Sequence, residues 1–130
     1  MLNPDLVGRT IVGATNTQIS EESIAIFASA LGDHSYTVTD AAPPTFGITI
    51  TLSQSQSLLQ GSGLDWSRVV HGDQRFEIFQ PLHAGMSLRC NCTIESARVV
   101  AGNEIVTVRA DLISDEQTLV SSWSTLVFRG

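Results

Sequence analysis

The chain has 130 residues, of which 42% are apolar and 15% are charged, and this composition is typical of a globular protein. The length predicts a single domain over residues 1–130, and the low charge favours an oligomer that covers apolar surface. The net charge of −6, with seven basic residues that are all arginine, argues against a basic nucleic-acid-binding face.

The sequence shows no segment that would send the chain to or across a membrane. Its N-terminus has neither the basic nor the apolar region of a secretory signal, and no apolar run approaches the roughly 20 residues that span a bilayer. We therefore expect a cytoplasmic protein without a membrane partner.

The first quarter of the chain predicts a strand followed by a helix. Residues 10–17 contain several β-branched side chains, which favour a strand. Ser20 then precedes two glutamates, an arrangement typical of a helix N-cap. Gly32 has the position of a C-cap. Between these signals, apolar residues recur at helical spacing: Ile24, Phe27, Ala28 and Leu31.

The segment after this helix is ambiguous. Residues 39–44 are polar and contain proline, which predicts a loop. Residues 46–52 alternate apolar and polar side chains as strands do, whereas residues 53–60 have only a weak helical pattern. We expect a short helix or an irregular segment over residues 46–60.

The second half predicts a meander of long antiparallel strands. Turns of hairpin length separate the last strands at residues 101–103 and 115–117, and a longer turn covers residues 80–85. The strands are expected over residues 68–79, 87–100, 103–114 and 119–129. Strands of this length favour a strongly curved sheet wrapped around a helix.

Cys90 and Cys92 are two residues apart on one predicted strand and share a face. Neither a second cysteine pair nor a neighbouring histidine completes a zinc site, so we interpret both as packed, reduced thiols and expect no metal.

Residues 32–40, Gly-Asp-His-Ser-Tyr-Thr-Val-Thr-Asp, contain half of an acid–base pair. Asp33 could supply the carboxylate, but Val38 occupies the position five residues later where a partner histidine would be needed. A valine can neither take nor give a proton.

Three further segments carry a resemblance to a known family. They are Pro-Thr-Phe-Gly-Ile at residues 44–48, Val-Val-His-Gly-Asp-Gln-Arg-Phe-Glu at residues 69–77, and Pro81-Leu82 followed by Gly85. In this order and at these intervals they resemble the FAS1-like dehydratase domain, the amino-terminal half of MaoC-type hydratases. The resemblance covers residues 7–129.

The resemblance implies an α+β hot-dog fold, in which a curved antiparallel sheet wraps around a shortened central helix and lies beside a second hot dog. In catalytic members, Gly-Asp-x-Asn-Pro-x-His-x-Asp supplies the Asp and His that handle the water. Gly32, Asp33 and Asp40 match this motif here, whereas Ser35, Tyr36 and Val38 depart from it. Asp33 is then a vestigial carboxylate.

By this resemblance the chain would be the acyl-chain-binding, non-catalytic subunit of an (R)-specific enoyl-CoA hydratase or (3R)-hydroxyacyl-thioester dehydratase. A MaoC-type hot-dog partner would supply the Asp/His dyad, and the substrate would be an acyl-CoA or acyl-carrier-protein thioester, with no cofactor. Six apolar or small residues are candidates to line the acyl site, with ordinary core packing as the other interpretation: Phe46, Gly47, Ile48, Leu52, Leu58 and Leu59.

Two other functions remain open at the level of sequence. A self-associating homodimer could act as a thioesterase or acyl-thioester binder, although residues 46–60 contain no acidic residue for thioester hydrolysis. A homo-oligomeric dehydratase could instead use a rewired histidine, for which His34 and His71 are the candidates. Solvent exposure of His34 and His83, and a structural hydrogen bond of His71, are the simpler interpretations.

Overall fold

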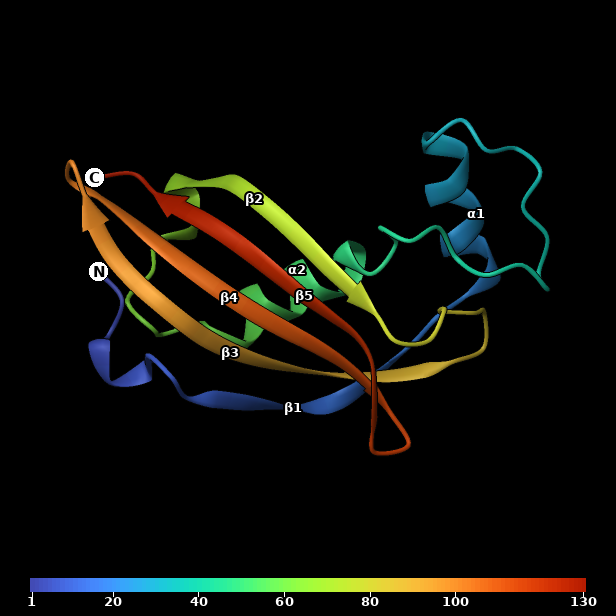
Figure 1. Ribbon diagram of the computed structural model, residues 1–130, viewed down its shortest axis with the longest axis horizontal. Coiled ribbons are helices and arrows are strands. Elements are labelled where there is room, and N and C mark those ends of the chain that lie inside the picture. Colours follow the sequence, from blue (N-terminus) through green and yellow to red (C-terminus); the bar gives the residue numbers. More distant parts are fainter.

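The computed structural model describes residues 1–130 and contains one sheet of five antiparallel strands, in the order β1-β3-β4-β5-β2 (Figure 1). Short 3₁₀ turns at Pro4–Leu6 and Trp66–Arg68 precede β1 and β2. The strands are β1 (Thr10–Gln18), β2 (Val69–Ile78), β3 (Ser87–Val100), β4 (Asn103–Ser114) and β5 (Gln117–Phe128). The predicted meander is confirmed, with strand ends within two residues of those expected.

The helix α1 (Glu21–Ala30) begins and ends where its capping residues predict. The Ser20 hydroxyl accepts a hydrogen bond from the Ser23 N–H at 3.0 Å. Gly32 has a φ of +88°, the left-handed conformation of a C-terminal cap. Ile24 and Ala28 of the predicted stripe are buried, but Leu31 is 59% exposed because the helix has already ended there. In Figure 1, α1 projects beyond the end of the sheet.

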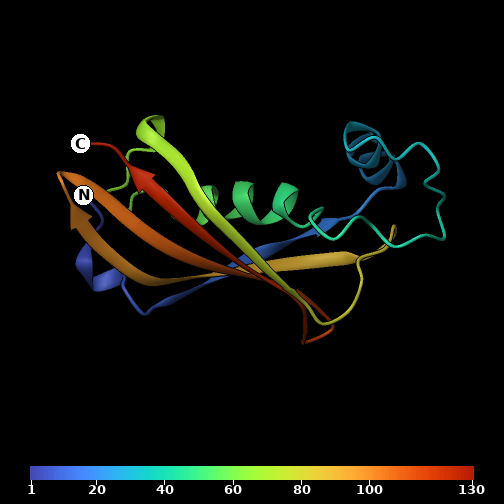
Figure 2. The same ribbon diagram turned by 45° about the horizontal axis from the view of Figure 1, so that its top comes forward.

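The ambiguous segment forms one helix, α2 (Ile48–Leu58), which lies along the concave face of the sheet (Figure 2). Its backbone approaches β3, β4 and β1 most closely. The segment is helical despite its alternating pattern, and a hydroxyl in its first turn bonds back to the backbone: Thr49 Oγ1 donates to the Phe46 carbonyl at 2.9 Å. A curved antiparallel sheet around a short helix is the expected α+β hot-dog fold. No helix has the combination of length and apolar composition needed to cross a bilayer.

Both tight hairpins have two-residue turns with left-handed backbone. Ala101 and Gly102 join β3 to β4, with φ of 51° and 79°. Asp115 and Glu116 join β4 to β5, with φ of 48° and 67°. Positive φ at both turn residues matches the right-handed twist of the flanking strands.

The core has two apolar clusters separated by a polar seam. One cluster packs around Ile50 at the first turn of α2, and the other packs around Leu59 just after its end. The seam between them is formed by five residues with hydroxyl or amide groups: Thr51, Ser55, Gln74, Ser122 and Ser124. The helix therefore meets the sheet through small polar side chains at its middle and through apolar ones at its ends.

Gly13 is the point where β1 passes closest to β3. It is buried, and a Cβ built there would overlap the carbonyl oxygen of Cys90. We predict that Gly13→Ala lowers the free energy of unfolding by about 1–3 kcal/mol, since the added methyl would force the strands apart. Urea unfolding measures the difference. Gly72→Ala is the control, because its Cβ would lie 3.4 Å from the nearest atom, the Thr125 carbonyl oxygen; an equal loss in both variants would contradict the prediction.

Cys90 and Cys92 are free, buried thiols, as predicted. Burial raises the pKa of Cys90 to about 12 and that of Cys92 to about 11. Thiols of the unfolded chain have pKa values of about 8.5. Above that pH the unfolded chain loses both thiol protons, whereas the folded state keeps them until the pH approaches the raised pKa values.

We predict that stability falls as the pH rises through ~8 to ~10, because the unfolded state is then the one that releases protons. The slope is at most about 1.4 kcal/mol per pH unit for each thiol. Urea unfolding across this range measures it. Replacing both cysteines with alanine should flatten the dependence, and an unchanged slope in that variant would assign the effect to other groups.

Candidate functional site

Asp33, the candidate catalytic carboxylate, is occupied by its own turn. Its Oδ1 accepts hydrogen bonds from the Ser35 hydroxyl at 2.8 Å and the Ser35 N–H at 3.0 Å. The bond from the Ser35 hydroxyl lowers the pKa of the exposed Asp33 most, and the bond from the Ser35 N–H lowers it further. A carboxylate that bonds the backbone two residues on is an ordinary turn-forming group.

No imidazole faces this carboxylate across the segment. His34 is exposed, and its Nδ1 lies 3.3 Å from the Ser29 hydroxyl. Val38 is 50% exposed, and Asp40 accepts a bond from the Thr37 N–H at 2.8 Å. Asp33 and Asp40 thus stabilise two local turns, and the segment holds no acid–base pair.

The edge strand β2 contributes one row of side chains to the concave face. His71 is paired with Leu126 and Phe76 with Ser122, and both partners are buried inward-facing residues of β5. A bulge between His71 and Asp73 places Gln74 on the same face. The His71 side chain is exposed and makes no hydrogen bond within the sheet, so a structural hydrogen bond of His71 across a subunit seam stays a prediction. His83, expected to be exposed, is half-buried.

Gln74 connects the edge strand β2 to the polar seam through two hydrogen bonds. Its Nε2 donates to Ser122 Oγ at 2.6 Å, and its Oε1 accepts from Ser124 Oγ at 2.7 Å. Ser122 Oγ also accepts from Thr51 of α2 at 3.5 Å. A chain of hydrogen bonds therefore runs from the sheet edge to the central helix.

Two largely apolar cavities lie at opposite ends of this seam. The His71 cavity, about 240 Å³, lies beside the C-terminal half of α2 and is lined by Leu52, Gln56, Trp66, Val69, His71 and Leu126. The proline cavity, about 320 Å³, lies near the start of α2 and is lined by Ala41, Ala42, Pro43, Pro44, Ile78, Pro81, Leu82 and Val120. The two cavities share no lining residue, and we refer to the concave side of β2 that carries both as the groove, which is the candidate binding surface.

The six residues expected to line an acyl site are distributed between this groove and the core. Leu52 lines the His71 cavity. Phe46 and Leu59 are core residues, 2% and 1% exposed. Gly47 is buried, whereas Ile48 and Leu58 are half-buried.

Sequence reasoning missed the polar members of the site. Gln56 and Trp66 line the His71 cavity, and Gln74 crosses the seam, yet none was a candidate. Side chains along β2 alternate between the two faces of the sheet. A bulge after His71 shifts this alternation by one residue, so a predicted bulge would have placed Gln74 and His71 on one face. No local signal brings Trp66 to α2, because that contact depends on the tertiary fold.

Arg75 forms no ion pair with a carboxylate. Its guanidinium instead lies over the Trp123 ring, 3.9 Å from the centroid, on the outer face of the sheet. The ion pairs of the chain both belong to Arg109, which meets Glu95 at 3.6 Å and Asp111 at 3.3 Å.

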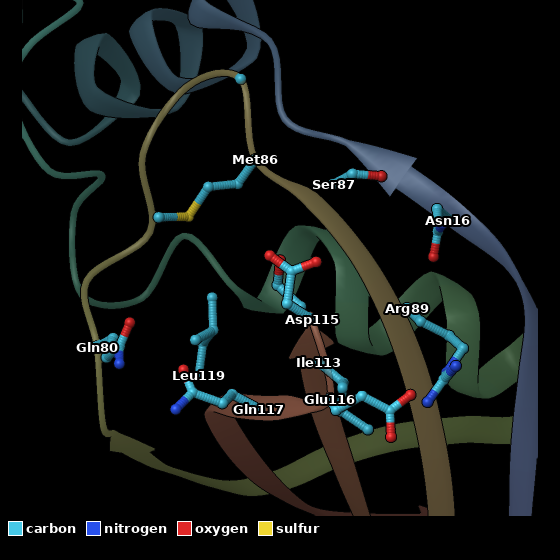
Figure 3. Close-up of a pocket in the computed structure, with 12 residues that line it drawn as sticks. Asn16, Gln80, Met86, Ser87, Arg89, Ile113, Asp115, Glu116, Gln117 and Leu119 are labelled. Carbon is cyan, nitrogen blue, oxygen red and sulfur yellow. The ribbon is translucent and has the colours of Figure 1, made fainter.

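The largest hollow, about 680 Å³, lies away from the groove (Figure 3). Its wall comes from β1, β3, the β4–β5 hairpin and the loop before β3, and α2 contributes nothing to it. Asp115, Glu116 and Arg89 border it without forming an ion pair. Its polar lining does not suit an acyl chain.

Comparison with known families and sequences gives a consistent result. Residues 5–121 match the family model described as FAS1-like, dehydratase domain region. A UPF0336 protein of Streptomyces coelicolor is 37% identical over 144 residues, covering 98% of this chain and 95% of that protein. A UPF0336 protein of Saccharopolyspora erythraea is 32% identical, covering 99% and 92%.

Solved structures share the fold. A chain of the HadBC (3R-hydroxyacyl-ACP dehydratase) complex from Mycobacterium tuberculosis has a TM-score of 0.82 at 22% identity, covering 97% of this chain and 99% of that one. HtdX from the same organism has a TM-score of 0.78 at 15% identity, covering 93% and 51%. A chain of its ChsH1–ChsH2 complex has a TM-score of 0.64 at 11% identity, covering 93% and 83%.

We predict that Gln74 and Ser122 are energetically coupled. Ser122→Ala should lower the free energy of unfolding by about 1–3 kcal/mol, because the half-buried Gln74 amide loses its hydrogen-bond partner. A double-mutant cycle with Gln74→Ala, followed by urea unfolding, should give a coupling of about 0.5–3 kcal/mol. Ser121→Ala, which breaks only the 2.6 Å bond to Asp111, provides a matched serine control that should be additive with Gln74→Ala. Additivity of the Gln74 and Ser122 changes would contradict the prediction.

Proposed function

Since the chain belongs to the FAS1-like dehydratase domain region family, we propose that it is the acyl-binding, non-catalytic subunit of an (R)-specific enoyl-thioester hydratase or 3-hydroxyacyl-thioester dehydratase. A second hot-dog subunit of MaoC type supplies the aspartate and histidine. The substrate is an acyl-CoA or acyl-carrier-protein thioester, and the cytoplasm is the expected location.

The observation that carries this proposal is the state of residues 32–40. Dehydration of a 3-hydroxyacyl thioester removes a proton next to the carbonyl and protonates the departing hydroxyl, which requires two positioned groups. Here Val38 offers no proton transfer, and the Asp33 carboxylate is held by Ser35. Residues 32–40 therefore offer no acid–base pair, and in the proposed assembly the partner contributes it.

The groove along β2 supports the acyl-binding role. Its two cavities are mainly apolar, and they lie on the concave face of the sheet beside α2, where a flexible chain can be shielded from water. Heteromeric assembly is supported by analogy only: HadBC and ChsH1–ChsH2 are complexes, and one chain of each shares this fold.

A thioesterase is the less favoured function. Hydrolysis by a hot-dog protein would need a carboxylate directed at the thioester from the central helix, but α2 contains no acidic residue. A dehydratase that relies on a rewired histidine has one structural point in its favour, since His71 lines a cavity in the groove. No carboxylate lines that cavity to work with it.

Hydration of crotonyl-CoA and of a long-chain enoyl-CoA tests the proposal. We predict negligible turnover by the isolated chain and restored turnover when it is mixed with the MaoC-type hot-dog protein from the same organism. The reason is that a general acid–base group contributes about 10²–10⁴-fold to the rate. Substantial turnover by the isolated chain would exclude the partner-dependent function.

Variants of the active mixture provide the controls. Asp33→Asn retains the ability to form the turn and should change kcat less than about twofold, and His34→Ala should behave likewise. The corresponding Asp→Asn change in the partner's Gly-Asp motif should cost at least the ~10² of a general acid–base group. A large loss of kcat in Asp33→Asn would place catalysis in this chain instead.

A further inference from the structure

The His71 cavity has the size of part of a ligand site. Its volume of about 240 Å³ lies below the roughly 300–1,000 Å³ of cavities that enclose a whole small molecule. It corresponds to about eight water molecules, at roughly 30 Å³ each. A whole acyl thioester is larger than this volume, so only one end of such a ligand would occupy the cavity.

The inner wall of this cavity suits a hydrocarbon chain. Leu126 is 1% exposed, and Leu52 and Val69 are half-buried around it. The Trp66 ring packs edge-on against Phe128, with the ring centroids 5.3 Å apart, so its position is fixed. These side chains form a rigid apolar surface.

Three hydrogen-bonding groups on the same cavity have no partner in the chain. The indole Nε1 of Trp66 is buried and unpaired, one of only four buried side-chain polar atoms in this state. The His71 imidazole and the Gln56 carboxamide are exposed and make no hydrogen bond within the chain. The Trp66 N–H is too deeply buried for a ligand in the cavity to reach, so the groups that can meet a ligand are the His71 imidazole and the Gln56 carboxamide.

An unsubstituted alkyl end would displace water from these groups without replacing its hydrogen bonds, which disfavours binding. A hydroxyl or carbonyl oxygen on the ligand could bond His71 or Gln56. Resting on the acyl-binding role proposed above, we propose that the His71 cavity receives the far end of the acyl chain and selects chains whose end carries an oxygen.

The reach of such a chain follows from the helix. Ile48 and Gln56 are eight residues apart on α2, which corresponds to ~12 Å of helix. With carbon–carbon bonds of about 1.5 Å, an extended chain rises roughly 1.3 Å per carbon, so about nine or ten carbons cover this length. Chains of medium length are the appropriate probes.

The test measures the binding of matched acyl-CoA pairs to the full chain by titration calorimetry. Octanoyl-, decanoyl- and dodecanoyl-CoA are each compared with the same thioester carrying a terminal hydroxyl. Trp66 fluorescence, followed in a Trp123→Phe background, reports occupation of the cavity itself. At one or more lengths the hydroxylated chain should bind about tenfold more tightly, equivalent to about 1.4 kcal/mol, and should change the Trp66 emission.

Matched substitutions locate the effect. His71→Phe and Gln56→Leu should reduce the advantage of the hydroxyl to less than about twofold while plain chains still bind. His34→Phe and Gln60→Leu are the same changes at exposed positions outside the cavity and should leave the tenfold preference intact.

The outcomes separate the two proposals. Equal binding of hydroxylated and plain chains at every length overturns the selectivity of the His71 cavity but leaves acyl binding in place. A hydroxyl preference that survives His71→Phe and Gln56→Leu also overturns it, since the oxygen is then recognised elsewhere. Failure of every acyl-CoA to bind overturns the cavity assignment and also excludes acyl-CoA as the ligand of the proposed function.

Discussion

The distance between the central helix and the sheet is set by small hydroxyl side chains. Thr51 of α2 is buried and donates a hydrogen bond to Ser122 of β5, and Ser55 is buried beside Cys92 of β3, so no long side chain holds the two layers apart. A larger residue at any of these positions would overpack the interface or lift the helix. Because the apolar clusters lie on either side of this contact, the groove, its two cavities and the tie to β2 all depend on it.

The same contact explains how one fold can separate binding from chemistry. The His71 cavity is formed by α2, β5, β2 and Trp66 just before β2, whereas residues 32–40 lie in the loop after α1 and are largely exposed. Loss of a histidine from that loop removes no core contact, so acid–base groups can be lost without disturbing the binding surface. Under the proposed function, a partner hot dog would perform the proton transfer while this chain binds the acyl group.

Much of the fold could be predicted from the sequence because its signals are local. Ser20 and Gly32 delimit α1, and hairpin-length turns separate the last strands. Alternation failed over residues 46–52 because the side of α2 that faces the sheet carries threonine and serine, which a hydrophobic pattern counts as exposed. The site was harder still, since Trp66 and Gln56 are ten residues apart and meet only when α2 and β2 have packed.

The strand order has a consequence for how the molecule acquires its shape. The three central strands form a meander whose hairpins can close locally, within about 1–10 μs in isolated hairpins. The edge strands instead join from far away in sequence: Thr10 meets Thr93 across 83 residues, and Gln74 meets Ser122 across 48. Closing such long loops costs conformational entropy, so these pairings form late in folding. We expect β1 and β2 to dock after the meander, so that an early intermediate would bury β3, β4 and β5 while possessing no groove at all.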